Sequence, residues 1–449
     1  MALTGIQILG MLPKTNCGEC NIPTCLAFAM KVAAGQTEIE ECPYVSDEAK
    51  ETIGAANAPP IRTVKIGAGD AEFIAGGETC LYRHDKRFEN QTGLAVLIST
   101  DEDAAEVDAK LKRANDIVIE RVGVMMCNNL VAVKDTGGGD LAAMAKKVME
   151  MAPKQAIILM SDNVESLKAG AEACGGNKPL LYGATADSVD DFAALAKDTG
   201  CAIGVKGKNM DDLIETTDKL IAAGVKDMVI DTGSRTLRGA YEDNIVARRA
   251  AVNDRFKALG FPTITFPCEM ADDLMMEAMI GSVLLAKYAA ITVFSDIQGE
   301  TIFPLMLEQL NIFTDPQRPM VVEEDIYPVG GPDENSPVLI TCNFSLTYFI
   351  VSGEIDGSKV PSWLLIKDTE GLSVLTAWAA GKFGADLIAM FVNKCGIADK
   401  VKHRELIIPG YLASIGGELE EELPDWTITI GPREAGHLPA FLKEWKPAS

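Results

Sequence analysis

Four cysteines near the amino terminus are the residues best suited to chemistry in this sequence of 449 residues. Two residues separate Cys17 from Cys20, four separate Cys20 from Cys25, and sixteen separate Cys25 from Cys42. A Cys-x-x-Cys pair can bind one metal centre from a single loop, and two single cysteines complete a set of four ligands. The spacing therefore predicts a metal site with four thiolate ligands.

Three interpretations of these cysteines compete: an iron–sulfur cluster, a structural zinc ion, and cysteines that are only packed or disulfide-bonded. Structural zinc usually takes two Cys-x-x-Cys pairs, whereas this segment contains one. Pro43, directly after Cys42, is typical of the Cys-Pro ending of bacterial cluster-binding segments. An iron–sulfur cluster is therefore favoured, covered by a short helix from Leu26 that Thr24 caps and that ends at Gly35.

Composition restricts the classes of partner. There are 41 Lys and Arg against 65 Asp and Glu, a net charge of −24, so nucleic acid and anionic membranes would repel the chain. No signal peptide or membrane-spanning stretch is visible, and eleven cysteines without a signal peptide favour a reducing compartment. We expect a cytoplasmic protein whose partners are proteins and small molecules, with most of the other seven cysteines packed as small core residues.

The length predicts more than one core, and three domains are expected: an iron–sulfur domain at 1–57, a barrel with an amino-terminal hairpin at 58–325, and a third domain at 326–449. A linker at Ala55–Pro60 ends the first domain. Residues 63–66 and 73–82 look like a hairpin that plugs the bottom of the barrel.

From Leu94 onward, short apolar runs alternate with amphipathic helical stretches, the pattern of parallel strands with helical crossovers. Eight strands predict a (β/α)8 TIM barrel; they lie at 94–98, 130–133, 156–160, 180–182, 202–205, 227–231, 263–266 and 289–294. Polar residues follow the strands, including Ser161 to Asn163, Asp231, Glu269 and Asp296. The plainer alternative is that these residues cap the next helices.

The third domain reads as an α/β doubly wound, Rossmann-like sheet. Its five predicted strands lie at 338–342, 363–367, 387–392, 405–408 and 426–430, and a connector at Gly330–Ser336 precedes them. Small or hydroxyl-bearing loops follow the strands, such as Pro409-Gly410-Tyr411 and Gly431-Pro-Arg433. Ligands bind at the carboxyl ends of such strands, so these loops predict a site for a large flat ligand; ordinary turn chemistry is the alternative for any single loop.

Several familiar sites are missing from the sequence. No Gly-x-Gly-x-x-Gly or Gly-Lys-Ser/Thr motif supports a nucleotide cofactor. His84, His403 and His437 are too few and too scattered for a three-histidine metal site. We expect each to be a structural or surface histidine.

Over its full length the chain resembles one family, the large (gamma) subunit of the corrinoid iron–sulfur protein of the reductive acetyl-CoA (Wood–Ljungdahl) pathway, part of the acetyl-CoA decarbonylase/synthase complex. The resemblance lies in the cysteine spacing, the eight-stranded middle, and the segments Thr341–Thr347 and Asp368–Trp378. It implies a 4Fe-4S cluster on Cys17, Cys20, Cys25 and Cys42, and a corrinoid (cobalamin-type) cofactor in the third domain.

The same resemblance assigns corrinoid contacts, to which the loops of the third sheet add their own residues. The contacts expected are Thr341, Thr347, Gly371, Leu372, Ser373, Val374, Thr376, Gly410, Tyr411, Gly431, Arg433 and Ala435. The sequence lacks the Asp-x-His-x-x-Gly motif that supplies a lower axial imidazole in many cobalamin proteins. We therefore expect cobalt without a histidine ligand, which makes cobalt(I) easier to reach.

The implied function is that of a methyl carrier working with methyltransferases. Its expected partners are the small subunit of the corrinoid iron–sulfur protein in a heterodimer, a methyl-tetrahydropterin methyltransferase, carbon monoxide dehydrogenase/acetyl-CoA synthase, and a low-potential electron donor. Two alternatives lack a corrinoid. In one the chain is an iron–sulfur barrel oxidoreductase with substrate at Asp231, Glu269 and Asp296, and in the other it is an electron-transfer adaptor.

Overall fold

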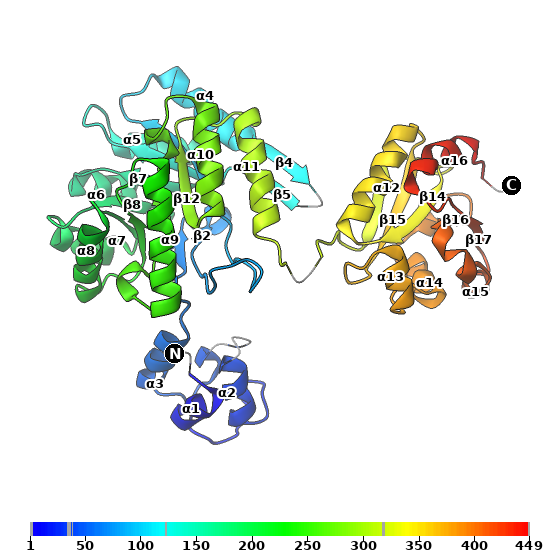
Figure 1. Cartoon of the computed structure of the whole chain (residues 1–449), viewed down its shortest axis with the longest axis horizontal. Helices are drawn as coiled ribbons and strands as arrows, with labels where there is room; N and C mark the ends of the chain where they lie inside the picture. Colours follow the sequence, from blue (N-terminus) through cyan, green and yellow to red (C-terminus); the bar gives the residue numbers. More distant parts are fainter. Residues whose placement is uncertain (1–2, 34–36, 38, 122–123, 317–318, 448–449) are drawn as a thin grey trace. The chain divides into compact units, whose positions relative to one another are not determined.

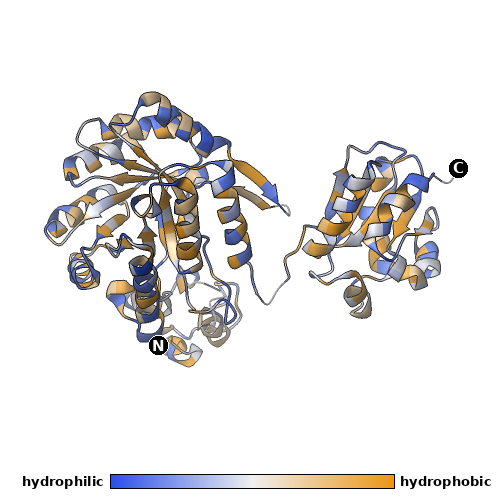
Figure 2. Ribbon diagram, turned by 45° about the horizontal axis from the view of Figure 1, so that its top comes forward, coloured by the Kyte–Doolittle hydropathy of each residue, from blue (hydrophilic) through white to orange (hydrophobic). Residues whose placement is uncertain are grey.

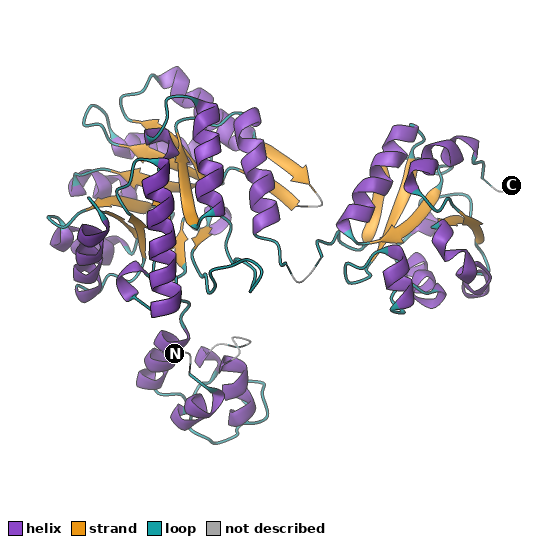
Figure 3. Ribbon diagram, in the orientation of Figure 1, coloured by secondary structure: helices purple, strands orange, loops and turns teal. Residues whose placement is uncertain are grey.

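The computed structural model describes residues 3–33, 37, 39–121, 124–316 and 319–447 (Figure 1). Contacts divide the chain into two compact units. Unit 1 comprises residues 1–81, 88–116 and 128–309, and unit 2 comprises residues 82–87, 117–127 and 310–449. Figure 3 shows that helices surround the strands in both units. Among the described residues, no helix is long and apolar enough to cross a membrane.

The cysteine module is helical. It contains α1 (Gly5–Met11), α2 (Cys25–Ala33), a short 3-10 helix (Ile39–Glu41) and α3 (Asp47–Asn57). The Thr24 hydroxyl accepts the Ala27 N–H at 3.1 Å, as expected of the predicted cap, and the helix begins at Cys25 rather than Leu26. Its predicted end, Gly35, lies outside the described residues. The predicted linker at Ala55–Pro60 is shorter than expected, because α3 continues to Asn57.

All eight predicted barrel strands are present and close into one parallel barrel. Their spatial order is β10-β11-β12-β3-β6-β7-β8-β9. The strands are β3 (Gly93–Ser99), β6 (Leu130–Lys134), β7 (Ala156–Met160), β8 (Leu180–Ala184), β9 (Ile203–Lys206), β10 (Met228–Asp231), β11 (Thr263–Thr265) and β12 (Ala289–Phe294). Figure 2 shows apolar residues concentrated on these strands and on the helix faces toward them.

Eight helices follow the strands and cover the barrel. They are α4 (Ala104–Asp116), α5 (Leu141–Met151), α6 (Val164–Ala173), α7 (Val189–Thr199), α8 (Met210–Ala222), α9 (Leu237–Asp254), α10 (Leu274–Ala286) and α11 (Gly299–Ile312). Asn163 accepts the N–H of Glu165 at 3.0 Å, so the capping alternative holds for this residue.

The predicted hairpin plugs the amino-terminal end of the barrel. β1 (Val64–Ile66) pairs antiparallel with β2 (Phe73–Ala75), and its apolar side chains join the interior cluster of the barrel. Gly93 is required at this contact, because a Cβ there would lie 2.7 Å from the Phe73 ring and 2.2 Å from Leu130. A second hairpin, β4 (Val118–Arg121) with β5 (Val124–Cys127), lies between α4 and β6 and was not predicted.

The third domain contains a five-stranded sheet in the order β13-β15-β14-β16-β17. The parallel strands are β14 (Val338–Cys342), β15 (Ser362–Lys367), β16 (Glu405–Ile408) and β17 (Thr427–Ile430). In chain order they lie 2-1-3-4, as in flavodoxin-like sheets, rather than in the 3-2-1 order of a dinucleotide-binding half. The Rossmann-like label therefore stays a prediction, while the doubly wound arrangement is observed.

One strand assignment in this domain was wrong, and one strand was not predicted. Residues 387–392 lie within a helix, α14 (Ala385–Lys394), in which Ile388 and Val392 are buried and Met390 is 68% exposed. A short apolar run fits a buried strand and a helix equally well. β13 (Asp325–Val329) was missed because Pro328 argued against a strand, yet it pairs antiparallel at the sheet edge, where proline is tolerated.

Helices cover both faces of the sheet. α12 (Ser345–Ser358) and α16 (Leu438–Glu444) pack on one face with Leu339, Leu364 and Ile407. The other face packs against α13 (Val374–Ala379), α14 and α15 (Gly416–Glu422). The chain leaves β14 toward β15 on one side and returns to β16 on the other, so the topological switch point lies between β14 and β16.

The connector at Gly330–Ser336 belongs to this sheet and is not a free linker. The Trp363 indole N–H donates to the Asp333 carbonyl at 2.9 Å, and the Lys402 N–H donates to the Glu334 carbonyl at 2.8 Å. Upstream of the predicted boundary at 326, Val322 already donates its N–H to the Asn343 carbonyl at 2.9 Å. These residues belong to unit 2, which includes the chain from residue 310 onward.

Candidate functional site

The four predicted cluster ligands share one small module. Cys42 is buried in its apolar core, and Cys20 and Cys25 pack against that core, whereas Cys17 is exposed. The loop that carries them uses the left-handed region repeatedly, with φ of 57° at Lys14, 50° at Asn16, 77° at Gly18 and 57° at Asn21. Loops of this kind turn successive N–H groups toward an anionic group such as a cluster.

Asn16 holds Cys25 through two hydrogen bonds. Its side-chain Oδ1 accepts the Cys25 backbone N–H at 2.8 Å, and its own backbone N–H donates to the Cys25 Sγ at 3.4 Å. N–H groups that donate to ligand sulfurs stabilise the reduced, more negative cluster and raise its reduction potential. Asn16 therefore orients one thiolate and tunes it, a role that the cysteine spacing did not reveal.

Replacing Asn16 separates these two functions. Asn16→Gly keeps the left-handed backbone and its N–H but removes the side-chain acceptor, so we expect iron to be released to a chelator about tenfold faster. Asn16→Asp keeps an acceptor and should release iron at close to the wild-type rate. Iron release can be followed with a coloured chelator, together with redox titration of the cluster by electron paramagnetic resonance. Equal release rates from the glycine variant and the wild type would contradict this role.

A second contact joins the two cysteine segments. The Tyr44 hydroxyl donates to the Glu19 carboxylate at 2.8 Å, connecting the Cys17–Cys20 loop to the segment after Cys42. This hydrogen bond and the charge of Glu19 raise the pKa of Tyr44, so the phenol stays protonated and remains a donor. The loop around the first two cysteines is thereby held next to the fourth.

The donor set fits an iron–sulfur cluster. None of the four cysteines of the module forms a disulfide bond in the structure, which argues against the disulfide alternative. Four thiolates within one module are the ligand set of a 4Fe-4S cluster. Among the residues that the structure describes, no group of three His, Cys, Asp or Glu side chains lies close enough together to hold a metal ion. The structure thus gathers the thiols in one neighbourhood without closing a cage.

Several other cysteines behave as core residues. Burial raises the pKa of Cys174 to about 11 and that of Cys268 to about 12, and it also raises the pKa of Cys201 and Cys395. A thiol with such a pKa stays protonated at neutral pH and is a poor metal ligand. These four therefore agree with the prediction that most cysteines outside the module are packing residues, whereas Cys127 is exposed.

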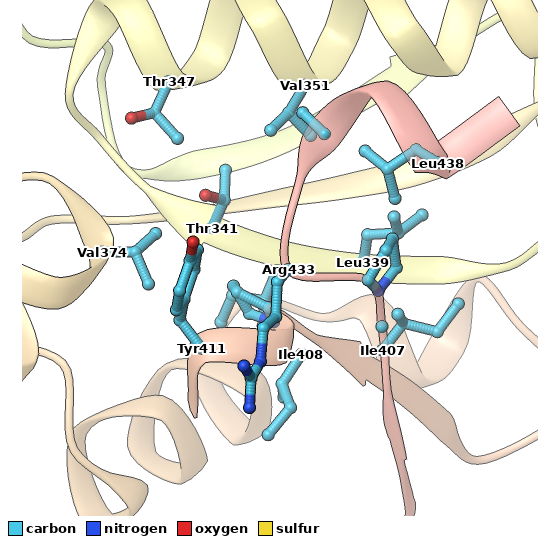
Figure 4. Close-up of a pocket in the computed structure, with 15 residues that line it drawn as sticks. Leu339, Thr341, Thr347, Val351, Val374, Ile407, Ile408, Tyr411, Arg433 and Leu438 are labelled. Atoms are coloured by element: carbon cyan, nitrogen blue, oxygen red, sulfur yellow. The ribbon is translucent and has the colours of Figure 1, made fainter. Parts of the chain in front are cut away.

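A cavity of about 140 Å³ lies at the topological switch point of the C-terminal sheet (Figure 4). Its walls come from the ends of β14 and β16, from α12, and from the turns after β16 and β17. Figure 4 shows the hydroxyls of Thr341, Thr347 and Tyr411 on one side and the aliphatic side chains of Leu339, Ile407 and Leu438 on the other. The site is therefore mostly apolar with a few hydroxyls.

Seven of the twelve predicted corrinoid contacts line this cavity: Thr341, Thr347, Val374, Tyr411, Gly431, Arg433 and Ala435. Gly410 lies directly behind the lining, because a Cβ there would stand 2.5 Å from the Gly431 carbonyl and 2.8 Å from the Arg433 N atom. Gly371, Leu372, Ser373 and Thr376 do not line it. Of the predicted turn at 371–376, only Val374 faces the cavity.

Asn343 organises that turn and was missed by the sequence reasoning. Its Oδ1 accepts the N–H groups of Thr369 and Gly371, each at 3.0 Å, and its Nδ2 donates to Asp368 at 2.8 Å. Gly371 adopts a φ of 76° beside it. The sequence feature that could have revealed it is an asparagine directly after a strand, where its amide can form hydrogen bonds with the loop that follows the neighbouring strand.

Exposed apolar side chains occur on the elements that line the cavity. Leu346 and Ile350 on α12 are 57% and 48% exposed, and Leu375 and Trp378 on α13 are 44% and 43% exposed. Ser345, at the start of α12, is buried with an Oγ that has no hydrogen-bond partner among the described residues. A cavity this small can hold only part of a corrin. The rest of the corrin ring must therefore lie against exposed apolar side chains around the cavity, such as these.

Histidine is absent from the lining residues of the described cavity. His403 bonds the Ser336 carbonyl at 2.9 Å and accepts the Glu405 N–H, at the opposite end of β16 from the cavity. His437 is exposed in the turn between Ala435 and Leu438. The residues present therefore fit a corrinoid bound without a protein imidazole.

Comparisons with known proteins identify the family. A family model described as CO dehydrogenase/acetyl-CoA synthase delta subunit matches residues 63–442, and a family model for an Fe-S cluster matches residues 12–44. The corrinoid/iron-sulfur protein large subunit of Moorella thermoacetica is 41% identical over 99% of both chains. The acetyl-CoA decarbonylase/synthase complex gamma subunit of Methanopyrus kandleri is 32% identical over 98% of both chains. The chain therefore belongs to the family of corrinoid/iron-sulfur protein large subunits and acetyl-CoA decarbonylase/synthase gamma subunits.

Proposed function

We propose that this chain is a methyl carrier of the acetyl-CoA pathway. It takes a methyl group from a methyl-tetrahydropterin through a partner methyltransferase and yields it to acetyl-CoA synthase. The strongest support is the 41% sequence identity, over 99% of both chains, to a corrinoid/iron-sulfur protein large subunit. The chain also contains both a four-cysteine module and a cavity at the switch point of the C-terminal sheet. The expected partners are the small subunit in a heterodimer, carbon monoxide dehydrogenase/acetyl-CoA synthase and a low-potential electron donor.

Each cofactor has its own site in this proposal. Cys17, Cys20, Cys25 and Cys42 hold a 4Fe-4S cluster, which supplies single electrons at low potential. The cavity residues and the apolar side chains around them hold a corrinoid, whose cobalt supplies a strong nucleophile when reduced. The Thr341, Thr347 and Tyr411 hydroxyls and the Arg433 guanidinium offer hydrogen bonds to amide groups at a corrin's edge, while the aliphatic residues exclude water from its face.

An absorption spectrum tests the proposal. Protein purified without oxygen should show corrinoid bands superimposed on the broad absorption of the cluster, and the corrinoid bands should change on reduction. A spectrum with cluster absorption alone would contradict the carrier proposal and favour an iron–sulfur barrel oxidoreductase or an electron-transfer adaptor.

A histidine placed at the cavity wall should alter the reduction of cobalt. Val374→His offers an imidazole from the lining, which should bind oxidised cobalt and be released on full reduction, lowering the midpoint potential. Glu420→His, on an exposed position of α15 outside the cavity lining, is the control and should leave the potential unchanged. Potentiometric titration and the nitrogen coupling in the cobalt(II) electron paramagnetic resonance spectrum measure this effect. If both variants keep the wild-type spectrum and potential, Val374 does not face the metal.

A further inference from the structure

The mouth of the barrel contains a second, larger cavity that the carrier function does not use. Its volume is about 770 Å³, and the carboxyl ends of six neighbouring strands, β6 to β11, supply its walls. In (β/α)8 enzymes this face carries the active site, and the volume lies within the usual range for sites that bind small molecules. The cavity lies wholly within unit 1.

The floor of this cavity is a rigid polar network. Asp231 is 1% exposed, and the Arg235 guanidinium donates to both of its oxygens, at 3.0 and 2.8 Å. The Tyr182 hydroxyl also donates to Asp231, at 2.5 Å. Burial and the Asp231 charge raise the pKa of Tyr182 well above its ordinary value, so the phenol remains a donor. Arg235 lies over the Phe266 ring, 4.7 Å from its centroid, and also bonds Glu269.

Barrel packing alone gives no reason for this network. Barrel interiors are ordinarily filled by branched aliphatic side chains, and apolar replacement of a buried ion pair is often neutral or stabilising. Here the ion pair fixes Tyr182, Arg235 and Glu269 at the base of an open cavity. Of the three residues of the predicted face, Glu269 lines the cavity and Asp231 bonds Tyr182 and Arg235, which line it. Asp296 pairs instead with Arg113 at 2.8 Å and does not line the cavity.

The β9 side of the cavity offers positive charge. Lys206 and Lys208 both line it, and among the described residues Lys206 pairs with no carboxylate. Lys208 has only a 3.9 Å contact with Asp187, and both of these side chains are at least 70% exposed. Thr185 and Ser188, after the adjacent strand β8, add two hydroxyls. Two ammonium groups beside two hydroxyls suit an oxyanion.

The β6 and β7 side offers acceptors instead. Asp135 and Asp162 line the cavity there. The Asp135 carboxylate accepts the Ser161 hydroxyl at 2.8 Å and the Gly137 N–H at 2.8 Å, which hold it in place. Asp162 is exposed and forms no ion pair within the described ranges. Carboxylates accept hydrogen bonds from hydroxyl or amino groups of a ligand.

We infer that the barrel mouth binds a small polar metabolite with an oxyanion, either phosphate or carboxylate, at one end and hydroxyl or amino hydrogens at the other. Lys206 and Lys208 hold the oxyanion, and Asp162 accepts from the donor end. The Tyr182–Asp231–Arg235 network keeps the floor between them fixed. This site is independent of the cofactors, because none of its residues lines the corrinoid cavity or belongs to the cysteine module.

Equilibrium dialysis of the full-length, cofactor-loaded protein tests the inference with three probes. Glycerol 3-phosphate and D-glycerate both carry hydroxyl donors and differ in the oxyanion, which is a phosphate in the first and a carboxylate in the second. Inorganic phosphate lacks these hydroxyl donors. We expect saturable binding of at least one of the two organic probes, and the tighter one identifies the preferred oxyanion. The double variant Lys206→Met, Lys208→Met should bind the preferred organic probe about tenfold or more weakly, which corresponds to about 1.4 kcal/mol.

Two further variants make the test specific. Asp162→Asn should weaken binding of the organic probe, because Asp162 contacts the probe's hydroxyl or amino end. It should leave competition by inorganic phosphate unchanged, because phosphate has no such end. Lys226→Met removes an exposed lysine just before β10, at the other end of the barrel, and should have no effect. Absence of saturable binding by both organic probes would overturn the inference. Binding that is equal in the wild type and the double lysine variant would also overturn it, because the anion is then adventitious.

Discussion

Replacing Cys42 by alanine is expected to abolish reductive reactivation of the cobalt while leaving methyl acceptance by already reduced cobalt intact. Cys42 is one of four thiols in the module, and a 4Fe-4S cluster needs all four thiolates to stay complete. The corrinoid cavity lies in unit 2 and the cysteine module in unit 1, so loss of the cluster should leave corrinoid content unchanged. Iron content, corrinoid absorption and the two activities can be measured on one preparation.

Cys174→Ala is the matched control for this variant. Cys174 is a buried free thiol in the barrel, and burial raises its pKa to about 11, as expected of a packing residue. It should retain full iron content and both activities. If Cys42→Ala lost methyl acceptance as completely as reactivation, the two cofactors would not act as separate modules.

The second large effect is expected from Gly410→Val, which should lower corrinoid content severely. A side chain at Gly410 would collide with the backbone of the turn after β17, 2.5 Å from the Gly431 carbonyl and 2.8 Å from the Arg433 N atom. Both of those residues line the cavity. The turns after β16 and β17 must therefore separate, which displaces Tyr411 and Arg433 from the site.

Gly417→Ala is its control, because a Cβ at Gly417 meets nothing within 4 Å. A second route to the same result is Val351→Phe, which adds volume to the cavity wall from α12 without changing the turns. Iron content should stay at the wild-type level in all three variants, because the cysteine module lies in the other unit. Wild-type cobalt content in both Gly410→Val and Val351→Phe would mean that the corrinoid binds elsewhere.

The barrel could be predicted from the sequence because each of its strands is a short apolar run bounded by turn residues and followed by a helical pattern. The C-terminal sheet was harder. The run at residues 387–392 has no polar interruption to distinguish helix from strand, and only the burial of Ile388 and Val392 beside exposed Met390 shows the helical period. The edge strand β13 was hidden by Pro328, whose missing N–H matters little at an edge.

The candidate sites were predictable where a residue type carries the chemistry by itself. The cysteine spacing located the module, and the loops after the strands together with the family resemblance gave the seven of twelve predicted corrinoid contacts that line the cavity. Gly371 to Ser373 and Thr376 fell outside the lining, because the sequence does not show that the turn faces Asn343 and Val321 rather than the cavity. Asn16 and Asn343 act through hydrogen bonds to distant backbone groups, and such partners appear only once the chain is folded.

Metal analysis of the full-length protein, purified without oxygen, tests the carrier function most directly. One chain should contain one cobalt and four iron atoms, because the switch-point cavity and the four-cysteine module each serve one cofactor. The cobalt should be extracted as a corrinoid, and the iron should be accompanied by acid-labile sulfide. Iron without cobalt, in protein that shows the native melting transition, would contradict the proposal that this chain carries a methyl group.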